Sequence, residues 1–315
     1  MSSEQLVDKY GRIIRKLRLS ITDRCNLRCR YCMPLEAQFM SKDEYLQPWE
    51  YTEIVRELAE LGITTVRITG GEPLLRKEFP EIIACLATIP NLELSLTTNA
   101  VLLERFLPLL QLYNVKKLNI SLDSLKADTF RSITYGQFLD KVKQAIETAV
   151  AKGFQVKLNM VVMRHYNDGE LVDIVEYSKR LQVEIRFLEL MQIGYACHLP
   201  QETFVSAQEM IDKLQGYYRF IPITSAPDST AFRFKTECGA TIGFIASESQ
   251  PFCGHCSRWR LSADGILRAC LFREEGIALR GMSREQRYSA YRQLLGMKPT
   301  TRGQSVSHAM YQIGG

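Results

Sequence analysis

The chain has 315 residues, of which 46% are hydrophobic and 24% charged, as is typical of a globular protein with a full core. No apolar run reaches the ~20 residues of a membrane span, and the N-terminus lacks a secretory signal, so we expect a cytoplasmic protein without membrane contact. The net charge of +5 is weak support for nucleic-acid binding, but it suits an anionic small substrate if it gathers in a cleft. Nine cysteines without an export signal indicate metal ligation in a reducing compartment, not disulfides.

Short apolar segments alternate with longer amphipathic segments from Lys16 onward. The predicted strands are 17–22, 65–69, 92–97, 117–122, 155–161 and 184–190. The predicted helices are 49–61, 79–86, 102–112, 138–151 and 169–180. Gly62 and Gly153 follow two of these helices directly, where glycine commonly ends a helix. This alternation predicts a parallel sheet with outer helices, either an open doubly wound sheet or a partial barrel.

Alternate residues of the predicted strands divide into an apolar face and a polar face. Arg18, Arg67 and Lys157 fall on the polar face, opposite leucine, isoleucine and valine side chains. A buried parallel strand is normally apolar on both faces, and buried cations are costly unless they are paired or meet a ligand. The pattern therefore predicts a wet cationic cavity, and internal salt bridges with residues such as Glu184 and Glu189 are the alternative.

Three cysteines follow the first predicted strand, Cys25, Cys29 and Cys32, in a C-x3-C-x2-C spacing. Three thiolates this close can ligate three irons of a 4Fe-4S cluster and leave the fourth iron open for a small molecule. Zinc is the alternative, but it usually takes four ligands and paired C-x2-C motifs, and no fourth ligand lies nearby. The spacing favours the iron–sulfur cluster.

The loop after the second predicted strand reads Thr69-Gly-Gly-Glu-Pro73. Paired glycines let a backbone approach a ligand closely, and the Glu72 carboxylate can accept hydrogen bonds from an ammonium group. A plain turn is the alternative, since such dipeptides are common in turns. The position at the C-terminal end of a strand, where parallel sheets usually bind ligands, favours a ligand contact.

The first cysteine triplet, with Tyr31 before its last cysteine, and the Gly-Gly-Glu-Pro loop resemble the radical S-adenosylmethionine (SAM) superfamily. The resemblance implies an α/β fold, a partial (β/α)6 TIM-like barrel, with SAM bound at the open iron. It implies reductive cleavage of SAM to a 5′-deoxyadenosyl radical, which takes hydrogen from a substrate. The residues that it implies for SAM binding are Tyr31, Gly71, Glu72, Ser121 and Met191.

After residue 191 the alternation ends, and we expect residues 192–315 to form a smaller α+β region. It carries a second cysteine triplet with C-x2-C-x13-C spacing and a hairpin turn at Ala263-Asp-Gly265. The cysteines of this second triplet are Cys253, Cys256 and Cys270.

The second triplet also has a zinc alternative, because a C-x2-C pair with a distant cysteine is common in zinc ribbons. Zinc would need His255 or Cys238 as a fourth ligand, and His255 lies between the paired cysteines, where its side chain tends to point away. We therefore favour a second 4Fe-4S cluster with an open iron. Cys85 and Cys197 are expected to be buried or free thiols.

The segment Arg258-Trp259-Arg260 places two guanidinium groups on one face of a strand, beside the second triplet. Arginines match phosphate oxygens in a fixed geometry. Together with Arg18, Arg67 and Lys157, these arginines predict a cationic pocket for a polyphosphate, although any single arginine could be a solvated surface residue.

Both triplets, the Gly-Gly-Glu-Pro loop, the Arg-Trp-Arg segment and the terminal Gly314-Gly315 together resemble the GTP 3′,8-cyclase family, from about Lys16 to the last residue. This resemblance implies a lyase that converts GTP to (8S)-3′,8-cyclo-7,8-dihydroguanosine 5′-triphosphate, the first step of molybdenum cofactor biosynthesis. It also implies an electron donor and a downstream cyclic pyranopterin monophosphate synthase, and it is compatible with a homodimer. The implied GTP contacts at the second cluster are Arg18, Arg67, Thr98, Lys157, Arg258, Trp259 and Arg260.

The terminal glycines would thread into the site, because their small backbone fits where side chains cannot, and a disordered terminus is the alternative. Two residues depart from the sequence that is usual in the family. Ala100 replaces the glycine of a common Thr-Asn-Gly, and Ser257 stands where asparagine is expected. Neither is a proposed cluster ligand.

A radical SAM peptide or protein maturase is the alternative function, since such enzymes also hold auxiliary clusters. They usually carry more C-terminal cysteines and need no triphosphate pocket. A metal-binding regulator of nucleic acid is a second alternative, but no basic helix or stacking platform supports it. The sequence leaves open the oligomeric state, the electron donor, the substrate pose, the tail position and the roles of Cys85, Cys197 and Cys238.

Overall fold

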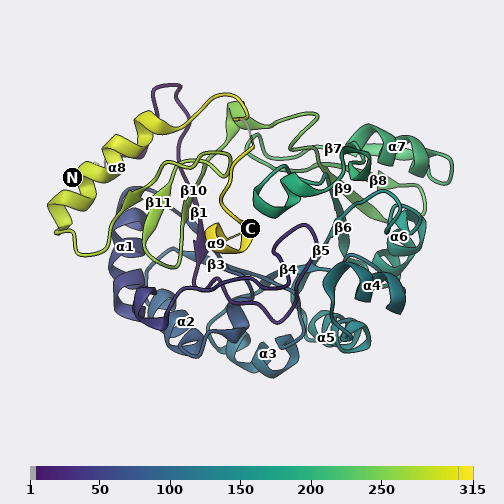
Figure 1. Ribbon diagram of the computed structural model, residues 1–315, viewed down its shortest axis with the longest axis horizontal. Coiled ribbons are helices and arrows are strands. Elements are labelled where there is room, and N and C mark those ends of the chain that lie inside the picture. Colours follow the sequence, from purple (N-terminus) through teal and green to yellow (C-terminus); the bar gives the residue numbers. More distant parts are fainter. Residues whose placement is uncertain (1–4, 304, 315) are drawn as a thin grey trace.

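The computed structural model describes residues 5–303 and 305–314, and a single curved sheet lies at its centre (Figure 1). Six parallel strands lie side by side in chain order, and their parallel pairing confirms the predicted α/β class. These strands are β1 (Lys16–Ser20), β2 (Thr65–Thr69), β3 (Glu93–Thr98), β4 (Lys117–Ser121), β5 (Gln155–Val161) and β6 (Glu184–Leu188).

Helices cover the outer side of this sheet, between successive strands (Figure 1). Gly62 and Gly153 follow α1 and α5 with φ of 102° and 79°, which confirms that both end a helix in the left-handed conformation. No helix in the described part of the chain is long and apolar enough to cross a membrane. The outer helices are α1 (Pro48–Glu60), α2 (Phe79–Ala87), α3 (Leu103–Leu112), α4 (Ala127–Thr134), α5 (Leu139–Ala151) and α6 (Leu171–Arg180).

The strands after residue 191 extend the same sheet at both edges. At one edge β9 (Thr241–Ile245) pairs in parallel with β6, and at the other β10 (Arg258–Leu261) pairs in parallel with β1. The chain therefore returns across the molecule and places the second cysteine triplet beside the first strand. The remaining elements are α7 (Ala207–Gln215), β7 (Phe220–Ile223), β8 (Phe232–Thr236), β11 (Ile266–Arg268), β12 (Ile277–Ala278), α8 (Arg284–Met297) and α9 (Met310–Ile313).

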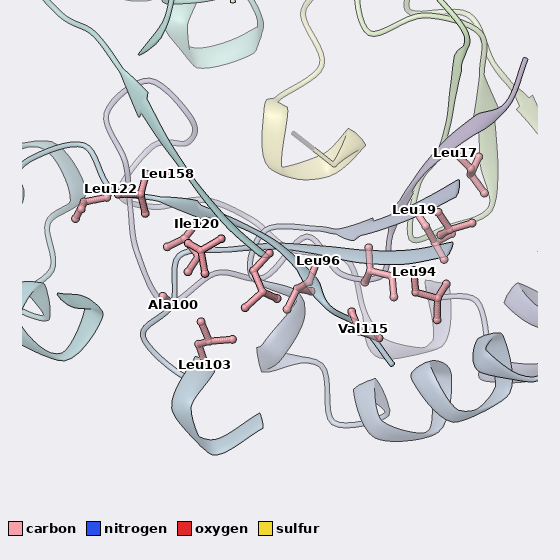
Figure 2. Close-up of a cluster of buried hydrophobic side chains, with 14 of the residues drawn as sticks. Leu17, Leu19, Leu94, Leu96, Ala100, Leu103, Val115, Ile120, Leu122 and Leu158 are labelled. Carbon is pink, nitrogen blue, oxygen red and sulfur yellow. The ribbon is translucent and has the colours of Figure 1, made fainter. Parts of the chain in front are cut away.

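The apolar faces of the strands form the main core under the outer helices. Figure 2 shows Leu96, Ile120 and Leu158 on the side of the sheet that faces Leu103 of α3, and all four side chains are fully buried. Burial of this face is the main favourable contribution to folding. Because alternate residues point to opposite faces, the polar residues between them point toward the inside of the curve, where α9 lies (Figure 1).

Ala100 occupies a backbone conformation that normally favours glycine. Its φ is +62°, in the left-handed region, which costs a residue with a side chain about 1–2 kcal/mol. The Thr98 hydroxyl accepts a hydrogen bond from the Ala100 N–H at 3.0 Å, and Ala100 is fully buried. Ala100 therefore replaces a glycine at a position where the backbone conformation favours glycine.

Candidate active site

A cavity of about 270 Å³ lies inside the curved sheet, and both cysteine triplets line it. The first triplet, Cys25, Cys29 and Cys32, follows β1 and lies at the carboxyl edge of the parallel strands. The second triplet lies at the opposite edge, because Cys253 and Cys256 precede β10, which is parallel to β1, and Cys270 follows the antiparallel β11. The cavity therefore spans the sheet from one triplet to the other.

The thiols of the first triplet are buried close together. Burial raises the pKa of Cys25 to about 11 and that of Cys32 to about 12, and the negative charges of neighbouring thiolates and carboxylates add to the increase. A cationic metal centre would reverse this preference and hold all three as thiolates. The donor set thus fits an iron–sulfur cluster, in which three thiolates bind three different irons.

For each triplet, a site for a single zinc ion is the alternative to an iron–sulfur cluster. Within residues 5–303 and 305–314, no group of three or more His, Cys, Asp or Glu residues is arranged to hold one metal ion. His255 and Cys238, the candidate fourth zinc ligands, are both exposed and lie outside the cavity lining.

The glycine pair after β2 packs directly on the first cysteine loop. The Gly71 N–H donates to the Thr22 carbonyl at 2.7 Å and the Glu72 N–H donates to the Arg24 carbonyl at 2.8 Å. A Cβ atom at Gly71 would lie 2.4 Å from the Arg24 oxygen. Glycine is thus required here by the protein's own backbone, while Gly71 also lines the cavity.

Glu72 is fully buried behind this loop, and it is absent from the cavity lining. Its carboxylate accepts hydrogen bonds from the Asn99 N–H at 2.7 Å and the Thr98 hydroxyl at 2.8 Å. Burial raises its pKa to about 7, although these hydrogen bonds oppose the increase. Glu72 therefore fixes the end of β3, and its predicted contact with the SAM amino group stays a prediction.

Gly71→Ala is expected to destabilise the protein by about 1–3 kcal/mol, because the added methyl group overlaps the Arg24 backbone. It should also lower the iron bound by the first triplet, since the cysteine loop must shift. Thermal unfolding and iron analysis measure these effects. Gly169→Ala is the matched control, because open space surrounds that position. Equal stability and iron content in both variants would contradict the role given to this contact.

Tyr31 and Asp123 form a hydrogen-bonded pair at the same edge of the cavity, and sequence reasoning missed Asp123. The Tyr31 hydroxyl donates to Asp123 Oδ2 at 2.8 Å, and the Val161 N–H donates to Oδ1 at 2.9 Å. Burial raises the pKa of Asp123 to about 6. Asp123 could have been predicted as a site residue from its position just after β4, at the carboxyl edge of the sheet. Ser121 and Met191 also line the cavity.

Three arginines form a row across neighbouring strands inside the cavity. Arg18 of β1 is in register with Arg260 of β10 and with Arg67 of β2. Burial lowers the pKa of Arg67 and of Arg260 to about 10 and that of Arg18 well below its usual value, and repulsion from neighbouring arginines adds to each decrease. Among the described residues none of the three forms a salt bridge, so the row suits a polyanion.

Arg258 and Thr98 line the same cavity, whereas Lys157 and Trp259 do not. Lys157 forms a salt bridge with Glu184 at 3.2 Å, so the alternative of internal salt bridges applies at this end of the sheet. Trp259 is fully buried in the hydrophobic core, because it alternates with the two arginines and faces the opposite side of β10. This placement does not support a side-chain contact between Trp259 and a nucleotide.

The C-terminal segment lies inside the curve of the sheet, with α9 beside the cavity (Figure 1). The Gly314 carbonyl accepts a hydrogen bond from Arg260 Nη1. A Cβ atom at Gly314 would lie 2.8 Å from both Ser20 Cβ and Thr69 Oγ1. Only glycine therefore fits this position, while Gly315 lies outside the described residues.

The second triplet lies in a more cationic environment than the first. Burial alone would raise the pKa of Cys256, but Arg258 and Lys298 outweigh it and lower that pKa to about 6. Arg258 also lies 5.0 Å above the Phe252 ring. A thiol that ionises this readily is a suitable metal ligand.

Comparisons with known proteins agree with this geometry. Residues 19–178 match the Radical SAM superfamily, and residues 183–303 match Molybdenum Cofactor Synthesis C. A GTP 3′,8-cyclase of Synechocystis sp. is 56% identical over 313 residues, which cover 99% of this chain and 96% of that protein. A GTP 3′,8-cyclase of Geobacter sulfurreducens is 40% identical, over 98% of this chain and 97% of that protein.

Solved structures share the fold at low sequence identity. Streptococcus suis SuiB bound to S-adenosylmethionine superposes with a TM-score of 0.64 and 11% identity, over 89% of this chain and 67% of that chain. This likeness concerns the fold alone.

Proposed function

The chain belongs to the GTP 3′,8-cyclase family of the radical SAM superfamily, and from this premise we propose that it converts GTP to (8S)-3′,8-cyclo-7,8-dihydroguanosine 5′-triphosphate. This lyase reaction is the first step of molybdenum cofactor biosynthesis. The observation that carries the proposal is the row of Arg260, Arg18 and Arg67 between two cysteine triplets in one cavity. A peptide maturase has no need of such a row, which makes that alternative the weaker one.

The proposal gives each set of residues a role. Cys25, Cys29 and Cys32 would hold one 4Fe-4S cluster, and Cys253, Cys256 and Cys270 would hold a second. When bound, these clusters and SAM supply the one-electron chemistry that removes hydrogen from the substrate. The arginine row would bind the triphosphate through charge-assisted hydrogen bonds and fix the ribose in the cavity, and this positioning lowers the entropic cost of reaction.

The remaining assignments are parts of the same proposal. Tyr31, Gly71, Ser121 and Met191 would contact SAM, with Asp123 fixing the Tyr31 hydroxyl. The Arg260–Gly314 contact supports a role for the tail in shaping the GTP site. An electron donor would reduce the first cluster, and a cyclic pyranopterin monophosphate synthase would take the product.

The test is an anaerobic assay of protein reconstituted with iron and sulfide, supplied with SAM and a strong reductant, with and without GTP. Mass spectrometry should find 5′-deoxyadenosine whose formation depends on GTP, together with a dephosphorylated, oxidised pterin derivative of the product. SAM cleavage that ignores GTP would reopen the choice of substrate, with a peptide as the next candidate. No cleavage despite intact clusters would contradict the SAM reaction itself.

Cys270→Ala is expected to reduce GTP cyclisation by more than the roughly 10–100-fold that changes around a metal ligand cost, because one thiolate of the second triplet is lost. SAM cleavage by the first cluster, measured with GTP present, should fall less than cyclisation does. The two products are measured separately in the same assay, with Cys238→Ala as a control for an exposed cysteine outside the cavity. Unchanged cyclisation in Cys270→Ala would remove the second cluster from the proposal.

A further inference from the structure

Lys298 is a buried lysine that connects the three segments of the second triplet. Only 2% of the residue is exposed, and its Nζ donates to Cys256 Sγ at 3.5 Å, to the Arg258 carbonyl at 2.7 Å and to the Ala269 carbonyl at 3.0 Å. These acceptors belong to the Cys253–Cys256 turn, to β10 and to the residue before Cys270. One ammonium group therefore holds together the chain segments that carry all three thiols.

Arg12 binds the backbone of Cys253 and of the segment that carries Lys298. Its Nη1 donates to the carbonyls of Cys253 and Pro299, each at 2.7 Å, and its Nη2 donates to the Lys298 carbonyl at 3.1 Å. Arg12 is itself buried and forms a 2.6 Å salt bridge with Asp8. The segment before β1 thus fixes the backbone of both Cys253 and Lys298.

The position of Lys298 depends on helix α8. The helix is anchored on α1, because Arg287 donates to the Glu57 carboxylate at 2.6 Å and the Tyr291 hydroxyl donates to it at 2.9 Å. Lys298 then follows as the first residue after the helix. Its position is therefore set by a packed helix and not by a flexible loop.

A buried ammonium group is costly unless it faces negative charge or accepting atoms. Two carbonyls and one sulfur surround Lys298, and no salt bridge involves it in the described part of the chain. The nearest source of negative charge is the group of cysteine thiolates. Positive charge and hydrogen bonds at the sulfurs of an iron–sulfur cluster favour its reduced, more negative state.

We propose that Lys298, held in place by Arg12, is a positioning residue that sets the spacing of Cys253, Cys256 and Cys270 and raises the reduction potential of the cluster they bind. The inference rests on the second cluster of the proposed function and assigns two residues outside the cysteine motif to it. Arg12 acts on the backbone of the site, whereas Lys298 acts both on the backbone and on the Cys256 sulfur.

The test isolates the second triplet by replacing Cys25, Cys29 and Cys32 with alanine in the full chain. Lys298→Met, Lys298→Arg and Arg12→Gln are made in this background, with Lys235→Met as the control for an exposed lysine on β8. After anaerobic reconstitution, iron per chain and the reduction potential are measured, the latter by electron paramagnetic resonance during a redox titration. Circular dichroism checks the fold.

Lys298→Met is expected to move the potential to a more negative value, or to lose iron with an unchanged circular dichroism spectrum. Lys298→Arg should stay closer to the parent potential because it keeps the charge. Arg12→Gln should broaden the resonance signal or lower the iron content, which decides the matter even if Lys298→Met does not fold. Lys235→Met should match the parent.

Unchanged iron and potential in both Lys298→Met and Arg12→Gln would overturn the inference while leaving the proposed function intact. An equal shift in Lys235→Met would also overturn it, since the effect would then be one of overall charge. If the background chain binds no iron at all, the second cluster itself fails, and the inference fails with it.

Discussion

Replacing Cys25 by alanine is expected to reduce SAM cleavage to the background rate. Cys25 lines the cavity with Cys29 and Cys32, and the Asn99 side chain lies 3.6 Å from its sulfur. With only two thiolates left, the first triplet would no longer hold the cluster at which SAM would bind and be reduced. Formation of 5′-deoxyadenosine, measured by mass spectrometry under reducing anaerobic conditions, reports the loss.

Cys197→Ala serves as the control for the Cys25 variant, because Cys197 is exposed and absent from the cavity lining. This control should retain parent activity and iron content. If Cys25→Ala still cleaved SAM at the parent rate, the first triplet would not be the site of the reaction, whatever the fate of the second.

Arg260→Ala is expected to weaken GTP binding by roughly 10- to 100-fold, which corresponds to the 1.5–3 kcal/mol of a hydrogen bond to a charged group. Arg260 is buried, lines the cavity and lies in register with Arg18. Its removal takes one of three adjacent cations from the triphosphate. Equilibrium dialysis of reconstituted protein against GTP under anaerobic conditions measures the affinity.

Arg15→Ala is the matched control for Arg260→Ala, since Arg15 is exposed at the start of β1 and absent from the cavity lining. Because Arg260 also donates to the Gly314 carbonyl, a chain that ends at residue 313 is a further comparison. If that truncation alone reproduced the whole loss, Arg260 would act through the tail. Unchanged affinity in Arg260→Ala would remove it from the phosphate site.

Much of the fold was predictable because it depends on neighbours in the chain. The alternation of strands and helices and the helix ends at Gly62 and Gly153 follow from local patterns. The short α4 was missed, since an eight-residue helix gives little periodicity. The pairing of β9 with β6 and of β10 with β1 was also missed, because pairing between strands that are distant in the chain leaves no local pattern.

Part of the candidate site was likewise predictable from local patterns, and part was not. Residues within the motifs, such as both cysteine triplets, were identified from spacing and do line one cavity. Asp123, Arg12 and Lys298 belong to no motif, and their importance appears only through partners far away in the chain. Trp259 belongs to a motif as well, but its side chain faces the core, and its predicted contact with GTP stays a prediction.

Which residues can share a face and which thiols can share a metal centre could be predicted from the sequence, since alternation along a strand and spacing along a loop are local properties. Only the fold shows that Arg260 lies beside Arg18, and that the two triplets lie at opposite ends of the parallel strands. The physical reason is the return of the chain to pair β10 with β1. That pairing completes a row of three arginines, and such a row suits a polyanion.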